Sequence, residues 1–115
     1  MSGIGAGTGV DAASMALAHS SLPADSVLAG SPTTALHPLT RVGDTEVGIW
    51  EMTPGTASDT EVDEVFVVLA GRARIAFEDP ALPDLEVGPG SVVRLADGMR
   101  TVWTVTETLR KVYIA

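Results

Sequence analysis

The sequence of 115 residues contains no cysteine and only two histidines, His19 and His37. Without cysteine, the chain forms no disulfide and offers no thiolate to a metal ion. Two histidines are too few for a site built from several imidazoles, so the sequence predicts no tightly bound zinc or iron. We therefore expect neither a metal nor another cofactor.

Basic residues and long apolar runs are also scarce. The chain has 7 Lys and Arg against 15 Asp and Glu, which gives a formal net charge of −8. Such a chain is repelled by nucleic-acid phosphates and by anionic membranes, so neither is an expected partner. No apolar run is long enough to span a bilayer, and the first residues, MSGIGAGTG, lack the basic and apolar regions of a signal peptide. A cytoplasmic protein is expected.

The chain divides by composition into an arm and one folded domain. Residues 1–24 are rich in Gly, Ala and Ser and almost uncharged. Their glycines do not follow a strand, which argues against a phosphate-binding loop. We predict a flexible N-terminal arm over 1–24, with a short helix around residues 12–18, and a single domain over 25–115.

Short apolar runs separated by turn residues predict that this domain is all-β. Expected strands cover residues 46–52, 64–70, 72–78, 85–87, 91–95, 101–106 and 109–114. Gly71 is expected to allow a tight connection between two of them, and Asp97-Gly98 is a hairpin-type turn signal. The regular spacing of strands and turns favours a β-sandwich or a small barrel.

Several spaced elements of the sequence resemble the cupin superfamily. They are Gly48–Gly55 (GIWEMTPG), Asp63-Glu64 with Leu69-Ala70-Gly71, Gly88-Pro89-Gly90, Gly98, Trp103, and Arg110–Tyr113 (RKVY). The similarity covers about residues 28–115 and is to the small single-domain branch related to (S)-ureidoglycine aminohydrolases and ethanolamine-utilisation cupins. It implies a double-stranded β-helix, which is the jelly roll of RmlC-like cupins, with a pocket inside the barrel and a homodimeric assembly.

The same resemblance bears on metal binding. Metal-binding cupins carry two histidines before a glutamate in a first motif and a third histidine in a second. Here the glutamate is Glu64, and the spacing places Ser58, Thr60 and Thr101 at the histidine positions. Neutral hydroxyls are poor ligands for transition metals, which need about three or four protein donors. The metal chemistry of the superfamily is therefore not expected here.

Alternation of side chains along strands extends these positions into a candidate ligand site. If Glu64 points into the barrel, Phe66 does so too, and an inward Thr101 implies an inward Trp103. Trp103 would then offer a flat apolar wall with one N–H donor, suited to a small planar or cationic ligand. The alternative is ordinary core packing, which is the preferred interpretation for Trp50.

The orientation of Lys111 is open. The resemblance marks the Lys111-x-Tyr113 pair as typical of this branch, which favours a functional face, with Lys111 pairing Glu64 and gripping a carboxylate. Apolar Val112 and Ile114 would instead be natural core residues and would turn Lys111 outward. The predicted ligand-binding residues are Ser58, Thr60, Glu64, Phe66, Thr101, Trp103, Lys111 and Tyr113.

Two other features are given structural interpretations. The acidic run of Asp59, Glu61, Asp63 and Glu64 lacks the spacing and glycine of a calcium loop, so a solvated acidic turn is predicted. His37 has no motif around it and is expected to be a loop histidine.

Two main functional hypotheses remain open. The first is metal-independent binding of a small polar metabolite, which the loss of all three histidine positions favours. The second is a small metabolic enzyme, aminohydrolase- or isomerase-like, with Glu64 as catalytic general acid or base on a nitrogen-containing or carboxylated metabolite. A third possibility is a purely structural or regulatory dimer with a filled barrel. An apolar outer face with Val65, Val67 and Leu69 would suit a homodimer interface.

Overall fold

The computed structural model describes residues 3–115, and they form strands and one short 3-10 helix. In chain order the elements are β1 (Ser20–Ser21), η1 (Ala24–Ser26), β2 (Val27–Ala29), β3 (Thr33–Val42), β4 (Thr45–Met52), β5 (Gly55–Thr60), β6 (Glu64–Asp79), β7 (Ala81–Val87), β8 (Val92–Leu95) and β9 (Arg100–Ile114). The predicted all-β fold is confirmed. In the described part of the chain no helix is long and apolar enough to cross a membrane.

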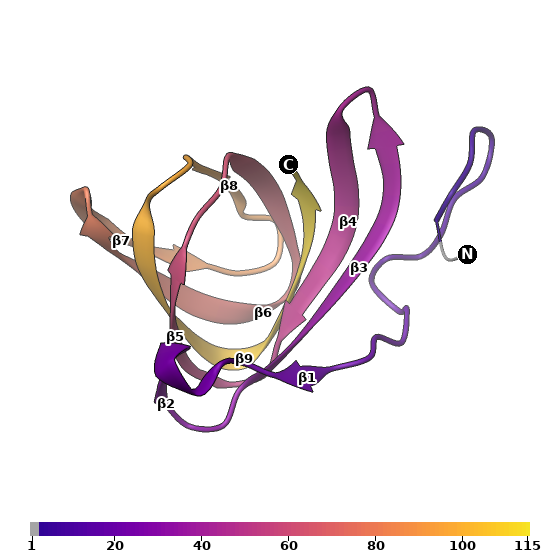
Figure 1. The fold of residues 1–115 in the computed structure, drawn as a ribbon. Helices are drawn as coiled ribbons and strands as arrows, with labels where there is room; N and C mark the ends of the chain where they lie inside the picture. Colours follow the sequence, from indigo (N-terminus) through magenta and orange to yellow (C-terminus); the bar gives the residue numbers. More distant parts are fainter. Residues whose placement is uncertain (1–2) are drawn as a thin grey trace.

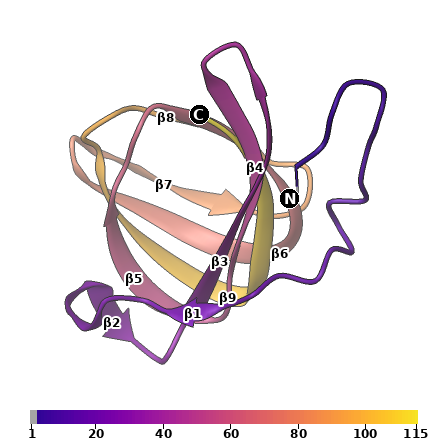
Figure 2. The same ribbon diagram turned by 45° about the vertical axis from the view of Figure 1, so that its right-hand side comes forward.

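Strand β9 organises the barrel. Along one edge it pairs with β6 for most of its length, and along the other its first half pairs with β5 and its second half with β4. Strand β3 extends the sheet beyond β4, while β7 and β8 pair with β6. The sheet curls around itself into a jelly roll (Figures 1 and 2).

Two predicted strand breaks are bends within continuous strands. Residues 64–70 and 72–78 were expected as separate strands but lie in the single strand β6, and 101–106 and 109–114 both lie in β9. Gly71 has φ +88°, and a side chain there would collide with the backbone carbonyl of Thr108 on β9. The pairing register of β6 with β9 shifts around Ala70 and Arg72. The glycine therefore marks a shared bulge that bends both strands, and the ladder continues beyond it.

Four strands were not predicted: the short β1 and β2, and the longer β3 and β5. Strand β3 contains His37, so this residue does not lie in a loop, and β5 follows Pro54 directly. The sequences of β3 and β5 carry Thr, Ser, Pro or charged residues at many positions, which hides the apolar alternation on which strand prediction depends.

The barrel interior is a single apolar cluster. Its buried members come mainly from β6, β8 and β9 and include Phe66, Val68, Ile75, Leu95 and Leu109, each at most 1% exposed. Phe66 and Val68 follow Glu64 at alternate positions of β6, as predicted. These apolar side chains fill the barrel beneath the cavity that Lys111 and Trp103 line.

The N-terminal segment lies along the outside of the barrel rather than within it. Residues 12–14 form a turn, so the predicted helix over 12–18 is wrong. The segment passes beside β3 and β4 in both views (Figures 1 and 2), and the amide of Ile4 donates to the carbonyl of Leu39 at 2.6 Å. Ile49, on the outer face of β4, is fully buried although it lies outside the barrel cluster.

Candidate functional site: a charged cavity above the barrel core

A cavity of about 510 Å³ opens between the strands β3, β4, β5 and β9 and the end of the N-terminal segment. Its lining residues are Leu22, Pro23, Ser26, Thr34, Leu36, Glu46, Trp50, Met52, Ala57, Ser58, Asp59, Glu61, Val62, Glu64, Trp103, Lys111, Tyr113 and Ala115. Four of these side chains are acidic and one is basic. The wall therefore combines apolar surface with an excess of negative charge.

The basic residue, Lys111, points inward and is 5% exposed. Its Nζ atom lies 2.7 Å from the Oε2 atom of Glu64. It also lies over the rings of Trp50, Phe66 and Trp103, at 4.7, 4.2 and 4.9 Å from their centroids. Of the two predicted orientations, Lys111 therefore adopts the one that points into the cavity, and the predicted Glu64–Lys111 pair is present.

Glu61 forms a second polar cluster, and it is 6% exposed. Its Oε2 atom accepts hydrogen bonds from the hydroxyl of Thr101 at 2.6 Å and from the indole N–H of Trp103 at 2.9 Å. These bonds fix the plane of the Trp103 ring. Its centroid lies 5.6 Å from the ring centroids of both Trp50 and Phe66. The prediction of a solvated acidic turn is therefore wrong for Glu61, although Asp63 is exposed and pairs with Arg94.

Asp59 lies at the solvent-exposed edge of the cavity beside these groups, and its pKa is raised to about 6. Loss of hydration is the main cause, and the nearby carboxylate of Glu61 raises the pKa further. A hydrogen bond from the backbone of Thr60 and the charge of Lys111 oppose the shift. Asp59 is thus the cavity carboxyl whose charge responds to pH near neutrality.

Tyr113 closes another side of the cavity. Its hydroxyl donates to the Oε2 atom of Glu46 at 2.6 Å, and burial together with this bond raises the pKa of the phenol. Gly48 on β4 leaves room for the ring, because a Cβ atom there would collide with it. The glycine of the GIWEMTPG element is therefore required by a cavity-lining side chain.

The strand register corrects two predicted positions. Ala57 pairs with Trp103 and Asp59 pairs with Thr101, and residues directly opposite in an antiparallel ladder share a face. Because Trp103 and Thr101 face inward, the inward residues of β5 are Ala57 and Asp59, one residue away from the predicted Ser58 and Thr60. Ser58 still lines the cavity, whereas Thr60 is exposed and does not.

Of the remaining predicted site residues, some line the cavity and others are buried behind its lining. Glu64, Trp103, Lys111 and Tyr113 line the cavity. Phe66 is fully buried beneath the ammonium group of Lys111, and Thr101 is 1% exposed, held by Glu61. The last two support the wall rather than forming it.

Among the aromatic and acidic side chains of the cavity, sequence reasoning missed Trp50, Glu46, Asp59 and Glu61. Trp50 was assigned to core packing, yet it is half-buried and lines the cavity. Its signal was available, since Trp50 lies opposite Lys111 in the ladder, two positions from the glycine that accommodates Tyr113. For Glu61, the two-residue spacing from Asp59 was the only hint that it shares an inward face.

These residues do not fit the transition-metal site that the fold family implies. The inward positions Ala57, Asp59 and Thr101 carry no imidazole, and the carboxylate of Glu64 holds the ammonium group of Lys111. Within residues 3–115 no three His, Asp or Glu side chains lie close enough together to hold a metal ion. We derive no chemistry through a metal.

Comparison with known proteins decides the family. The model of the EutQ-like cupin domain family matches residues 39–113, which is more than half of the chain. The chain belongs to this family. Its small cupin fold therefore agrees with the jelly roll predicted from spaced sequence elements.

Solved structures show the same cupin fold. The Clostridium difficile EutQ protein is 18% identical, with a TM-score of 0.61, covering 72% of this chain and 67% of its own. A DUF861-family protein of unknown function from Pseudomonas syringae is 23% identical, with a TM-score of 0.74, covering 89% of this chain and 45% of its own. A DUF861-family protein from Thermotoga maritima is 27% identical, with a TM-score of 0.51, and the match covers 56% of this chain and 73% of that protein. No curated protein sequence matches this cupin.

Proposed function

We propose that this cupin binds a small polar metabolite in the cavity, without a transition metal, and that the ligand is cationic or neutral rather than anionic. The observation that carries the proposal is the charge of the wall, where four carboxyl side chains face one lysine. Glu64 neutralises that lysine and Glu46 pairs with Arg41 at 3.5 Å, whereas Asp59 and Glu61 form no ion pair within residues 3–115. An anion entering this space meets uncompensated negative charge, whereas a cation or a hydrogen-bond donor does not. The earlier idea that Lys111 grips a carboxylate loses support for the same reason.

The size and composition of the cavity support a small ligand. Its volume of about 510 Å³ falls in the range of small-molecule sites. Trp50 and Trp103 supply flat apolar surface, and the carboxylates supply acceptors at defined positions. This combination of apolar walls and few polar groups is typical of binding pockets.

Tryptophan fluorescence offers a direct test, because Trp50 and Trp103 are the only tryptophans in the chain and both line the cavity. We would titrate the protein with n-butylammonium, n-butanol and butyrate, which share one carbon chain and differ in charge. Saturable binding is expected, with the highest affinity for n-butylammonium, a lower affinity for n-butanol and the lowest for butyrate. Tightest binding of butyrate, or no binding of any probe at millimolar concentration, would contradict the proposal.

A matched pair of variants locates the binding. Thr34→Phe places a ring into the cavity from β3, whereas Thr106→Phe adds the same ring at an exposed position of β9 outside it. The first variant is expected to lose probe binding and the second to keep it. Equal binding by both variants would place the site elsewhere.

An enzymatic function is the second candidate, and one observation favours it. Asp59 has a pKa of about 6, and a carboxyl group that gains and loses a proton near neutral pH is suited to acid–base work. Glu64 is less suited to that role than was expected, because its carboxylate is held by Lys111. Turnover of an amine or amide substrate that Asp59→Asn abolishes and Glu64→Gln only reduces would support the enzyme.

A further inference from the structure

Lys111 is the only lysine in the chain, and it is buried in a cage of three aromatic rings and one carboxylate. The rings belong to Trp50 on β4, Phe66 on β6 and Trp103 on β9, so three separate strands supply the walls. Glu64 closes the cage at 2.7 Å from the Nζ atom. An ammonium group in this position has lost most of its hydration and gains ring and carboxylate contacts in its place.

At Glu64, where the cupin resemblance implies a metal ligand, the carboxylate holds an ammonium group. Glu64 is the single member of the metal-ligand set that the sequence keeps, and Lys111 binds it. The other inward positions are occupied by Ala57, Asp59 and Thr101, of which only Asp59 is charged. Asp59 lies near enough to Lys111 for the lysine charge to lower the pKa of Asp59.

We infer that Lys111 is a tethered cation that takes the place of a metal ion beside Glu64. Its cage is a binding site for a primary ammonium group, and the chain fills this site with its own lysine. The recognition chemistry is that of aromatic ammonium cages: ring faces attract the cation, and one carboxylate compensates its charge. The cage is distinct from the exposed part of the cavity, where Asp59 lies. The inference does not depend on the ligand proposed above.

The first test empties the cage and offers it a free ion. Lys111→Ala removes the ammonium and leaves the three rings and Glu64 in place. Methylammonium, which reproduces the end of the lysine side chain, is expected to bind this variant about tenfold or more tightly than the wild type. Binding is followed by tryptophan fluorescence and by the rise in melting temperature, against sodium chloride and methanol at equal concentration.

Two further variants make the result specific. Lys111→Met refills the cage with an uncharged chain and is expected to respond to methylammonium no more than the wild type. The double variant Lys111→Ala/Glu64→Gln keeps the space but removes the carboxylate, and it is expected to lose the added affinity. Because Lys111→Met and Lys111→Ala carry the same net charge, cations bound elsewhere in the acidic cavity contribute equally to these two variants. Equal affinity of Lys111→Ala and the wild type, or of the single and double variants, would overturn the inference.

A second test uses the wild-type protein and so does not depend on how well a variant folds. Because Lys111 is the only lysine, labelling with 13C-lysine gives one set of side-chain signals. Three rings around the ammonium are expected to shift the Hε protons upfield of free lysine, and the shift is expected to disappear in urea. Native Hε signals at the free-lysine position would show that the ammonium is not caged.

Discussion

The hydroxyl of Thr101 donates to the carboxylate of Glu61, and the indole of Trp103 donates to the same oxygen. Both donors lie on β9, and the acceptor lies in the loop after β5, so these bonds join two parts of the site. Thr101 also offers its oxygen to the Trp103 indole at 3.1 Å. A buried carboxylate with few donors depends strongly on each of them.

Thr101→Val tests this dependence, because valine keeps the shape of threonine and removes the donor. We expect a loss of about 1–3 kcal/mol in the free energy of unfolding, since a buried charged acceptor loses one partner. Urea denaturation measures it. Thr106→Val, on the same strand but exposed, is expected to change stability by less than about 0.5 kcal/mol. Equal effects at the two positions would contradict the role given to the Glu61 cluster.

Asp59 gives the molecule a predictable pH response. Its pKa is about 6 in the folded chain against an ordinary value of 3.8, so the folded state holds the proton more tightly than the unfolded state. The ionised carboxylate therefore costs stability, and this cost grows as pH rises from about 4 to about 6 and remains above that range. Asp59→Asn removes it.

We expect Asp59→Asn to melt at a higher temperature than the wild type at pH 7.5 and at nearly the same temperature at pH 4. Thermal unfolding followed by circular dichroism at several pH values measures the difference. Asp84→Asn, at an exposed position of β7, is the matched control and is expected to show no such trend. A difference for Asp59→Asn that does not vary with pH would show that burial does not shift this carboxyl.

Residue-scale prediction from the sequence succeeded where alternation along one strand was sufficient. Glu64 with Phe66, and Thr101 with Trp103, could be oriented because each pair shares a strand face. It failed for Thr60 and put Ser58 on the wrong face of β5, although Ser58 still lines the cavity, since a one-residue error in the start of a strand moves every side chain to the opposite face. Trp50 and Glu61 were missed because their roles depend on cross-strand neighbours, which local patterns do not reveal.

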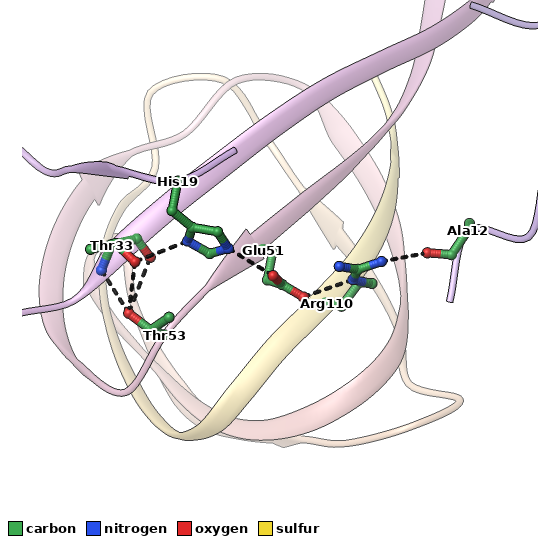
Figure 3. A network of polar contacts seen from close by, with 6 residues as sticks. All are labelled: Ala12, His19, Thr33, Glu51, Thr53 and Arg110. Atoms are coloured by element: carbon green, nitrogen blue, oxygen red, sulfur yellow. Dashed lines mark hydrogen bonds and ion pairs between the residues drawn. The ribbon is translucent and has the colours of Figure 1, made fainter. Parts of the chain in front are cut away.

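At the scale of elements, the N-terminal segment is attached to the barrel by a polar network centred on Glu51 of β4. Glu51 accepts from Arg110 at 2.7 Å through one oxygen and contacts the His19 ring at 2.7 Å through the other. Arg110 also donates to the carbonyl of Ala12 at 2.9 Å, and His19 contacts the hydroxyl of Thr33 (Figure 3). The network explains why Arg110, on the outer face of β9, is only 8% exposed.

Arg110→Met is expected to release this segment, because it removes the bonds to both Ala12 and Glu51. Hydrogen exchange measured by mass spectrometry should be faster in the peptide covering residues 3–22, with the barrel strands unchanged. Arg72→Met is the matched control: its contact with Glu107 is 3.9 Å long and both side chains are about two-thirds exposed. Unchanged exchange of residues 3–22 in Arg110→Met would show that the network does not hold the segment.

The same network has a pH limit. Burial opposes ionisation of Glu51, but hydrogen bonds from Arg110 and His19 outweigh it, so the pKa of Glu51 lies below its ordinary value of 4.5. The contribution of Glu51 to stability is therefore present above about pH 4.5 and is lost as pH falls through its folded pKa. Wild-type exchange of residues 3–22 is expected to accelerate in that acidic range once the intrinsic pH dependence of exchange is subtracted.

Element prediction from the sequence was limited by the bulges of this fold. Gly71 and the polar pair Glu107-Thr108 have the composition of turns, and they lie close together across β6 and β9. A turn and a bulge need the same residue types, so the local sequence does not separate a strand that ends from one that bends. The cupin resemblance identified the jelly roll nonetheless, since it depends on the order of elements and not on their ends.

At the scale of the whole molecule, the outer face of the barrel carries a valine patch. We define it as Val65, Val67, Val92, Val112 and Ile114. Val67 pairs with both Val92 and Val112, and Val65 pairs with Ile114, so the side chains are contiguous across β8, β6 and β9. Val92 is 66% exposed and Ile114 is 38% exposed. The patch contains two of the three residues on which the predicted homodimer interface depends.

We expect two copies of the chain to associate through the valine patch, because a contiguous apolar sheet face is self-complementary under a two-fold axis. Light scattering should then give a mass of twice 11.8 kDa for the wild type. Val92→Arg is expected to give a folded protein of 11.8 kDa, since this exposed side chain takes no part in the barrel core. Leu82→Arg, at a similarly exposed position of β7 near the opposite end of β6, should leave the dimer intact. A wild-type mass of 11.8 kDa at high concentration, or dissociation by Leu82→Arg alone, would exclude this interface.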